Sequence, residues 1–137
     1  MKIQHVDIKY VNQVWPTISS YLEEAVKRQG ANPDYTLDQV KMCVTNGQWM
    51  LLVALDEHNE VSGAATVEFI NRPSNRVAFV SYAGGRLMSN MNSAENLKVL
   101  LKSFGATSIE CAASGSTERL WQRLGFAEKH KILEVTI

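Results

Sequence analysis

Two consecutive glycines and an arginine stand where a predicted strand gives way to a predicted helix. The strand pattern covers residues 77–83, and the helix pattern of residues 91–104 follows Gly84, Gly85 and Arg86. Glycine lets the backbone approach a ligand closely, and the unpaired N–H groups at the start of a helix favour anions. The turn is therefore a candidate site for a pyrophosphate group, with Arg86 as a charged contact. The alternative is a plain glycine turn, since so short a motif often occurs by chance.

Other reactive side chains do not form a recognisable site. Ser114-Gly115-Ser116 lacks the Gly-x-Ser-x-Gly frame of a nucleophile elbow. Cys111 lies in an apolar run far from Cys43, as is typical of a buried free thiol. We expect no metal, because the three histidines are scattered without ligand spacing: His5, His58 and His130.

Length and charge exclude several classes of protein. The 137 residues suit one domain spanning 1–137. Lys plus Arg and Asp plus Glu both total 14, so the chain lacks the basic character of a nucleic-acid-binding protein. No run approaches the ~20 apolar residues that cross a bilayer, and no signal sequence is recognisable. We therefore expect a cytoplasmic protein with no membrane contact.

Apolar periodicity divides the chain into strand and helix patterns. The strand patterns cover residues 3–11, 49–55, 61–70, 77–83, 108–113 and 127–137. The helix patterns cover residues 16–30, 36–47, 91–104 and 116–125. Pro16 suits the first turn of its helix, and Thr36 with Gln39 has capping-box spacing.

This order of elements predicts the fold class. A strand, two helices, three strands and then alternating helices and strands favour a mixed α/β fold with a largely antiparallel sheet and helices on its faces. The segment from residue 77 to residue 113 has the length of a parallel, right-handed βαβ unit. We therefore predict that residues 77–83 and 108–113 are adjacent parallel strands.

Together with the glycine turn, the end of the chain resembles one known family. Leu120-Trp121, Gly125 and Phe126 match the spacing of a Leu-Tyr-x-x-x-Gly-Phe segment found near the end of many members of the GNAT (general N-acetyltransferase) superfamily. The layout is similar over most of the chain, and the motifs occupy about 83–105 and 114–126. A closer similarity, to small GNAT-like proteins of bacteriophages, rests on four segments: Trp15-Pro16, Gly63-Ala64-Ala65, Ala83-Gly84-Gly85 and Leu124-Gly125-Phe126.

The resemblance implies acetyl-CoA as the ligand. The strand of residues 77–83 would splay from its neighbour, so that backbone N–H groups of Val80 to Tyr82 serve the thioester oxygen. The full set of implied cofactor contacts is Val80, Ser81, Tyr82, Gly84, Gly85, Arg86, Ser114 and Trp121. The chain departs from the family by lacking an Arg/Gln-x-x-Gly-x-Gly/Ala string between residues 83 and 97.

A second departure concerns catalysis. The tyrosine that many members use as general acid falls on Trp121, whose indole cannot protonate a thiolate. Tyr82 is the substitute acid, because simple alternation places it on one face of its strand with Val80 and points Ser81 the other way. Glu68 and Glu110 are candidate bases, acting through water. The alternative is that both carboxylates face solvent and that Tyr82 is an ordinary sheet residue.

The resemblance therefore implies an acetyl-CoA-dependent N-acyltransferase acting on an amine of a protein or a small metabolite. The rival is a catalytically inactive GNAT-like module that binds a host or virion protein. Either would be a monomer or a homodimer.

Overall fold

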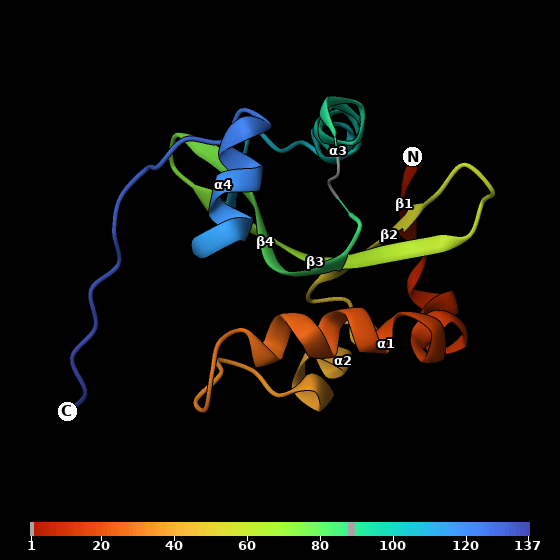
Figure 1. The fold of residues 1–137 in the computed structure, drawn as a ribbon, viewed down its shortest axis with the longest axis horizontal. Coiled ribbons are helices and arrows are strands. Elements are labelled where there is room, and N and C mark those ends of the chain that lie inside the picture. Colours follow the sequence, from red (N-terminus) through yellow and green to blue (C-terminus); the bar gives the residue numbers. More distant parts are fainter. Residues whose placement is uncertain (1, 88–89) are drawn as a thin grey trace.

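The computed structural model describes residues 2–87 and 90–137, which form one sheet covered by helices on both faces (Figure 1). The strands are β1 (Lys2–Val6), β2 (Met50–Leu55), β3 (Val61–Arg72), β4 (Asn75–Gly85) and β5 (Ser108–Cys111). The α-helices are α1 (Val11–Lys27), α2 (Leu37–Thr45), α3 (Met91–Ser103) and α4 (Gly115–Arg123), and a 3₁₀ turn covers Ile8–Tyr10.

The sheet has the strand order β1-β2-β3-β4-β5. β1 to β4 are antiparallel neighbours, and β5 is parallel to β4, with Val77 opposite Ser108 and Val80 opposite Cys111. The chain passes from β4 to β5 through α3. The predicted mixed α/β fold and the predicted parallel pair are both confirmed.

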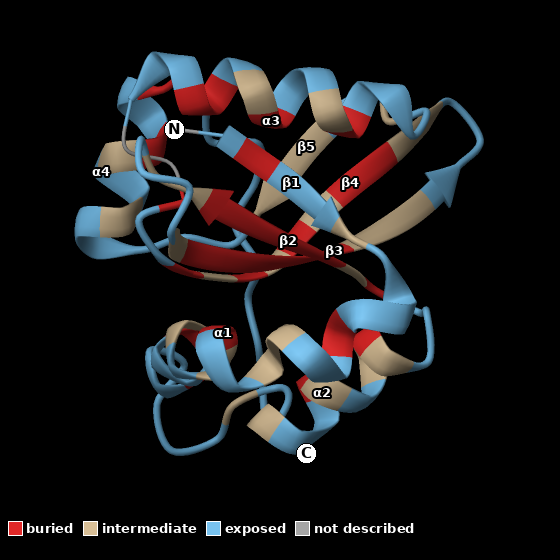
Figure 2. Ribbon diagram, turned by 90° about the vertical axis from the view of Figure 1, so that its right-hand side faces the viewer, coloured by how far each residue is buried: buried red, intermediate tan, exposed pale blue. Residues whose placement is uncertain are grey.

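Two apolar cores lie on the two faces of the sheet. α1 and α2 cover one face, and α3 and α4 cover the other (Figures 1 and 2). β2 contributes Leu51 and Val53 to the core beneath α1 and α2, and Leu52 and Ala54 to the core beneath α3 and α4. This double burial explains why the strand reads as a continuous apolar run instead of an alternating one.

The first strand is shorter than the pattern predicted. β1 ends at Val6, because Asp7 accepts a hydrogen bond from the Lys9 backbone N–H (3.1 Å) and turns the chain into the helical region. α1 then begins at Val11, so the expectation that Pro16 occupies a first turn is wrong. Pro16 lies inside the helix on its exposed side, where water can hydrogen-bond the carbonyl that the missing N–H leaves unpaired.

The capping box of α2 is confirmed. The Thr36 hydroxyl accepts from the Gln39 backbone N–H (3.2 Å), and the Gln39 side chain accepts from the Thr36 backbone N–H (2.9 Å). These reciprocal bonds satisfy two backbone groups that the start of a helix otherwise leaves unpaired.

The last predicted strand is not present. Residues 127–137 form no helix or strand, and the chain runs away from the sheet after α4 (Figure 1). Alternation alone marks a segment that is suited to a strand, but a strand also needs a hydrogen-bonding neighbour.

Candidate active site

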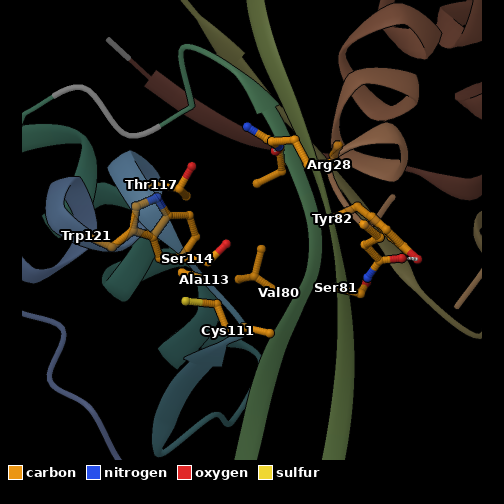
Figure 3. A pocket seen from close by; sticks show the side chains of 13 residues that line it. Arg28, Val80, Ser81, Tyr82, Cys111, Ala113, Ser114, Thr117 and Trp121 are labelled. Atoms are coloured by element: carbon orange, nitrogen blue, oxygen red, sulfur yellow. Dashed lines mark hydrogen bonds between the residues drawn. The ribbon is translucent and has the colours of Figure 1, made fainter. Parts of the chain in front are cut away.

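A pocket opens where β4 and β5 part. The two strands pair only as far as Val80 opposite Cys111, whereas β4 continues to Gly85. The pocket has a volume of about 320 Å³ and lies between the end of α1 and the start of α4 (Figure 3). Its lining consists mostly of small and polar residues: Ala25, Arg28, Gln29, Val80, Ser81, Tyr82, Ala83, Cys111, Ala112, Ala113, Ser114, Thr117 and Trp121.

A β-bulge at Ser81 shapes this part of β4. Thr66 of β3 lies opposite Tyr82, and the next residue, Val67, lies opposite Val80, so Ser81 is an extra residue. The Ser81 hydroxyl lies 2.7 Å from Thr66 Oγ1 and donates to the Thr66 carbonyl at 3.2 Å. These contacts hold the bulge against β3, while the ladder to β5 ends one residue earlier.

The bulge reverses the expected side-chain alternation. Val80 packs in the core beneath α3 and α4, and Tyr82 packs in the core beneath α1 and α2. The prediction that these two side chains share a face is therefore wrong, because one inserted residue shifts everything beyond it to the opposite face.

Tyr82 is engaged with the α1–α2 layer. Its hydroxyl donates to Gln29 Oε1 at 2.7 Å. The centroid of its ring lies 6.2 Å from that of the Trp49 ring and 6.3 Å from that of the Tyr35 ring. Burial raises the pKa of the phenol above its usual value. Figure 3 shows Tyr82 on the opposite side of β4 from Cys111, Ser114 and Trp121. The phenolic proton thus points away from the side on which α4 closes the pocket.

Arg28 brings the only formal charge to the pocket lining, counting the described residues. It follows the last turn of α1, and its guanidinium donates to the Ala83 carbonyl of β4. Because Arg28 occupies it, the Ala83 carbonyl faces away from β3. The N–H and C=O of one extended residue point to the same side, so the Ala83 N–H faces away from β3 as well. The sequence placed Arg28 near the end of a helix, but nothing in it indicated contact with a strand 55 residues further along the chain.

The opposite wall comes from β5 and α4. Ser114 is the N-cap residue of α4, yet its side chain makes no capping hydrogen bond. Trp121 is buried and packs against Phe126 with ring centroids 5.0 Å apart. Burial raises the pKa of the Cys111 thiol to about 11, so this cysteine stays protonated and is a poor nucleophile. Ser114 and Trp121, which the resemblance named as cofactor contacts, therefore lie at the same pocket as Val80, Ser81 and Tyr82.

The glycine pair lies inside β4 rather than in a turn. A Cβ atom on Gly84 would lie 2.0 Å from the Tyr21 carbonyl oxygen of α1, and Gly85 has a φ of +69°. The Arg86 backbone N–H donates to the Ser62 carbonyl at 2.8 Å. None of Gly84, Gly85 and Arg86 lines the pocket. Close packing against α1 and β3 accounts for the glycines without a ligand, and their contact with pyrophosphate remains a prediction.

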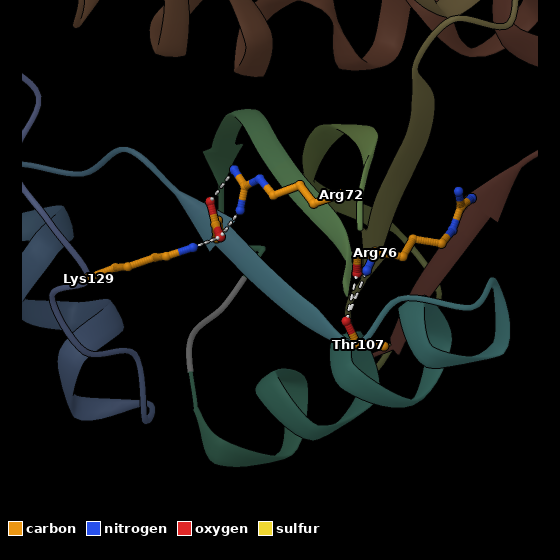
Figure 4. Close-up of polar contacts among 5 residues, drawn as sticks. Arg72, Arg76, Thr107 and Lys129 are labelled. Carbon is orange, nitrogen blue, oxygen red and sulfur yellow. Dashed lines mark hydrogen bonds and ion pairs between the residues drawn. The ribbon is translucent and has the colours of Figure 1, made fainter. Parts of the chain in front are cut away.

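The two expected bases lie elsewhere. Glu110 receives hydrogen bonds from Arg72 (3.0 Å) and Lys129 (2.8 Å), and these contacts, that of Arg72 first, hold its pKa below the usual glutamate value (Figure 4). Glu68 is half-buried on β3, where its charge adds to burial in raising the pKa of Cys43. Neither carboxylate lines the pocket, so a role of Glu68 or Glu110 as a base acting through water stays a prediction.

The Glu110 contacts predict a pH-dependent contribution to stability. Because folding lowers its pKa, the contribution is present above the unfolded value of about 4.3 and is lost as pH falls through the folded value. We expect Glu110→Gln to lower the free energy of unfolding by about 1 kcal/mol at pH 7 and by much less at pH 3. Urea denaturation of both proteins at the two pH values measures this, and an equal difference at both would contradict it.

Neither a metal site nor a membrane span is found in the described part of the chain. Across residues 2–87 and 90–137, no three His, Cys, Asp or Glu side chains gather where they could hold a metal ion. No helix in the same residues combines the length and the apolar character needed to cross a bilayer.

Comparison with known proteins identifies the fold. The sequence matches no protein-family profile and no curated protein. A predicted acetyltransferase from Clostridium acetobutylicum, solved with acetyl-CoA, aligns at TM-score 0.66 and 16% identity over 98% of this chain and 95% of its own. An aminoglycoside acetyltransferase from an uncultured soil metagenomic sample, solved with sisomicin, aligns at TM-score 0.69 and 12% identity over 99% and 94%. A ribosomal-protein-alanine N-acetyltransferase from Brucella melitensis aligns at TM-score 0.65 and 12% identity over the whole of both chains. The chain therefore has the fold of the GNAT acetyltransferases.

Proposed function

We propose that the protein is an acyl-CoA N-acyltransferase whose pocket between β4 and β5 receives the thioester end of acetyl-CoA. The observation that carries this proposal is the parting of the two strands beyond Val80 and Cys111, with a pocket at that place. Two structures of the same fold belong to acetyltransferases, and a third, of a predicted acetyltransferase, was solved with acetyl-CoA. When bound, acetyl-CoA would supply the acetyl group as a thioester.

The lining residues fit such a ligand. Backbone groups of β4 beyond its pairing with β5, among them the Ala83 N–H, would hydrogen-bond the amides and the carbonyl of an acyl-pantetheine arm. Val80, Ala112 and Ala113 offer small apolar contacts, and Ser114 offers a hydroxyl that makes no bond to its own helix. Gly84, Gly85 and Arg86 remain the proposed pyrophosphate contacts.

Proton movement would depend on water. No carboxylate or imidazole belongs to the described lining of the pocket, and the Tyr82 phenol donates to Gln29. The acceptor amine would therefore lose its proton to solvent, and solvent would protonate the departing thiolate. On this view the rate rises with pH up to the pKa of the acceptor amine itself.

The role of Tyr82 can be tested by removing its hydroxyl. We expect Tyr82→Phe to keep turnover within about threefold of the unchanged protein, because the phenol is bonded to Gln29 on the far side of β4. The loss of a general acid would instead cost on the order of 10²–10⁴ in rate. Steady-state rates decide between the two, and a loss in the larger range would restore Tyr82 as the acid.

The charge of the pocket predicts the class of acceptor. With Arg28 as the one charged side chain in the described lining, we propose an acceptor that carries a carboxylate near its amine. Polycationic amines would be disfavoured.

We expect Arg28→Gln to lower kcat/KM about tenfold for a mixture of amino acids, but little for the same mixture of amino acid amides. Lys27→Gln is the control, because Lys27 pairs with Glu23 at 3.3 Å and does not line the pocket. Mass spectrometry of the N-acetylated products gives both rates. Equal losses for acids and amides would contradict a charge-specific role.

The function itself is tested in two steps. Acetyl-CoA at a hundred times its dissociation constant should stabilise the fold by about 2.7 kcal/mol, visible as a thermal shift. Acetylated amine should then accumulate. Binding without transfer would favour the rival non-catalytic module, for which the missing acid at Trp121 is the supporting observation. If acetyl-CoA does not bind at millimolar concentration, the result contradicts both the acyltransferase proposal and the hypothesis of a non-catalytic module that binds acetyl-CoA.

A further inference from the structure

Thr66 is a polar side chain in the middle of an apolar sheet. It lies on β3 and is 0% exposed, and only one other polar residue of the described chain, Ser93, is buried as completely. Ser93 closes the capping box at the start of α3, whereas Thr66 caps no helix. Burying a hydroxyl costs free energy unless it is hydrogen-bonded, and valine would suit the strand equally well. The hydroxyl of Thr66 therefore needs a reason of its own.

The Thr66 and Ser81 hydroxyls form a closed pair. The Ser81 hydroxyl donates its single proton to the Thr66 carbonyl at 3.2 Å. In the contact of 2.7 Å between the two side-chain oxygens, Thr66 must then be the donor and Ser81 the acceptor. Both hydroxyl protons are thus used, and the pair joins β3 to β4 at the place where the bulge interrupts the backbone ladder.

This pair favours the bulge over a regular ladder. With the bulge, the Ser81 side chain lies on the same face of the sheet as those of Thr66 and Tyr82 (Figure 3). Without it, Tyr82 would still lie opposite Thr66, but Ser81 would lie opposite Val67, a residue of the core beneath α3 and α4. Both hydroxyls would then lose their partner in apolar surroundings, which is unfavourable. The two side chains therefore select the bulged arrangement.

The bulge in turn sets the course of the β4 backbone along the pocket. A bulge bends its strand and increases the local twist. Here it comes directly after Val80, the last residue of β4 that pairs with β5, so the bend falls where the two strands part. Ser81, Tyr82 and Ala83 line the pocket, and Thr66 does not. Thr66 thus acts on the lining from the neighbouring strand.

We propose that Thr66 is a positioning residue for acyl-CoA binding, a role that rests on the function proposed for the pocket. Its hydroxyl, paired with that of Ser81, holds the bulge that directs the backbone of residues 81–83 toward the acyl-pantetheine arm. Thr66 itself does not touch the ligand. Its effect on the affinity for acetyl-CoA is therefore indirect, and it depends on the hydroxyl and not on the size of the side chain.

Three threonine variants test this role by isothermal titration calorimetry with acetyl-CoA. Thr66→Val removes the hydroxyl and nearly keeps the shape of the side chain, and Ser81 can still donate to the backbone carbonyl of residue 66. We therefore expect a folded protein whose dissociation constant for acetyl-CoA is about tenfold higher. Thr66→Ser keeps the hydroxyl and should stay within about twofold of the unchanged protein.

Thr45→Val is the matched control. The Thr45 hydroxyl donates to the Lys41 carbonyl at 2.9 Å within α2, and Thr45 does not line the pocket. Its loss should leave the affinity for acetyl-CoA within about twofold.

Thermal unfolding separates positioning from stability, since each variant is titrated well below its own unfolding temperature. If Thr66→Val is less stable but binds acetyl-CoA as tightly as the unchanged protein, Thr66 serves stability alone and the proposal is overturned. A Thr66→Ser protein that binds as weakly as Thr66→Val would also overturn it, because the hydroxyl would not be the group that matters.

Hydrogen exchange of the ligand-free proteins tests the bulge without acetyl-CoA. The backbone amides of Ser81 and Tyr82 should exchange about tenfold faster in Thr66→Val than in the unchanged protein, and at the unchanged rate in Thr45→Val. Unaltered exchange in Thr66→Val would show that the hydroxyl does not hold the bulge, and the positioning role would be rejected. If exchange rises as expected but the unchanged protein binds no acetyl-CoA, the function proposed for the pocket is wrong and the positioning role falls with it, although the pair still holds the bulge.

Discussion

Ala113→Phe is expected to abolish acetyl-CoA binding while leaving the fold as stable as before. Ala113 is exposed and lines the pocket between β4 and β5, so a phenyl ring there would occupy the space that the acyl-pantetheine arm needs. No core contact is disturbed, because the side chain replaced is a single exposed methyl group. We expect the dissociation constant for acetyl-CoA to rise about 100-fold or more, measured by isothermal titration calorimetry.

Ala127→Phe is the control for this substitution. Ala127 is also exposed but does not line the pocket, so the same added ring should leave acetyl-CoA affinity within about twofold. Thermal unfolding of both variants shows whether the fold is intact. Unchanged affinity in Ala113→Phe would mean that acetyl-CoA, if it binds, binds outside this pocket.

Gly84→Ala is expected to be the most destabilising single methyl addition among the described glycines. Its Cβ would lie 2.0 Å from the Tyr21 carbonyl oxygen and 2.6 Å from the carbonyl carbon, both backbone atoms of α1. Side-chain rotation cannot relieve such a clash, so α1 must move away from the sheet and loosen the core beneath it. We expect the free energy of unfolding to fall by about 3 kcal/mol or more.

Gly30→Ala provides the comparison. Gly30 has a φ of +85° but no atom within 4 Å of an added Cβ, so this variant measures backbone strain without a clash. We expect Gly30→Ala to lower the free energy of unfolding by about 1 kcal/mol. Chemical denaturation of both variants checks the order, and a Gly84→Ala protein no less stable than Gly30→Ala would show that α1 and β4 are not packed this closely.

Local patterns predicted the elements that depend on local interactions. The continuous apolar run after Trp49 is a strand buried on both faces, and the capping box at Thr36 starts α2 where the spacing placed it. The change of apolar period after β4 correctly predicted a helix and a following parallel strand. Each of these features depends on the order of residues within one element or one crossover.

The site depends on contacts that no local pattern carries. The bulge at Ser81 is set by its partners on β3, and it moves Tyr82 to the face opposite Val80. Gly84 looked like a turn residue, whereas its lack of a side chain is required by a helix more than 60 residues earlier in the chain. Glu110 pairs with Arg72 and Lys129. Both cations are distant from it in sequence, so the local pattern showed a carboxylate and gave no sign of its partners.

The C-terminal segment shows the same limit. Its alternation predicted a strand, and the structure leaves residues 127–137 without one. A strand pattern states which residues suit an extended chain and does not state which edge they pair with.

The most direct test of the proposed function is a crystal structure of the protein with a thioether analogue of acetyl-CoA, which binds but cannot transfer its acetyl group. The proposal predicts the acyl-pantetheine arm between β4 and β5, with its amides hydrogen-bonded to the backbone of residues 81–83 and its sulfur on the side of Ser114 and Trp121. An analogue bound elsewhere, or a pocket that stays empty at saturating analogue, would contradict it.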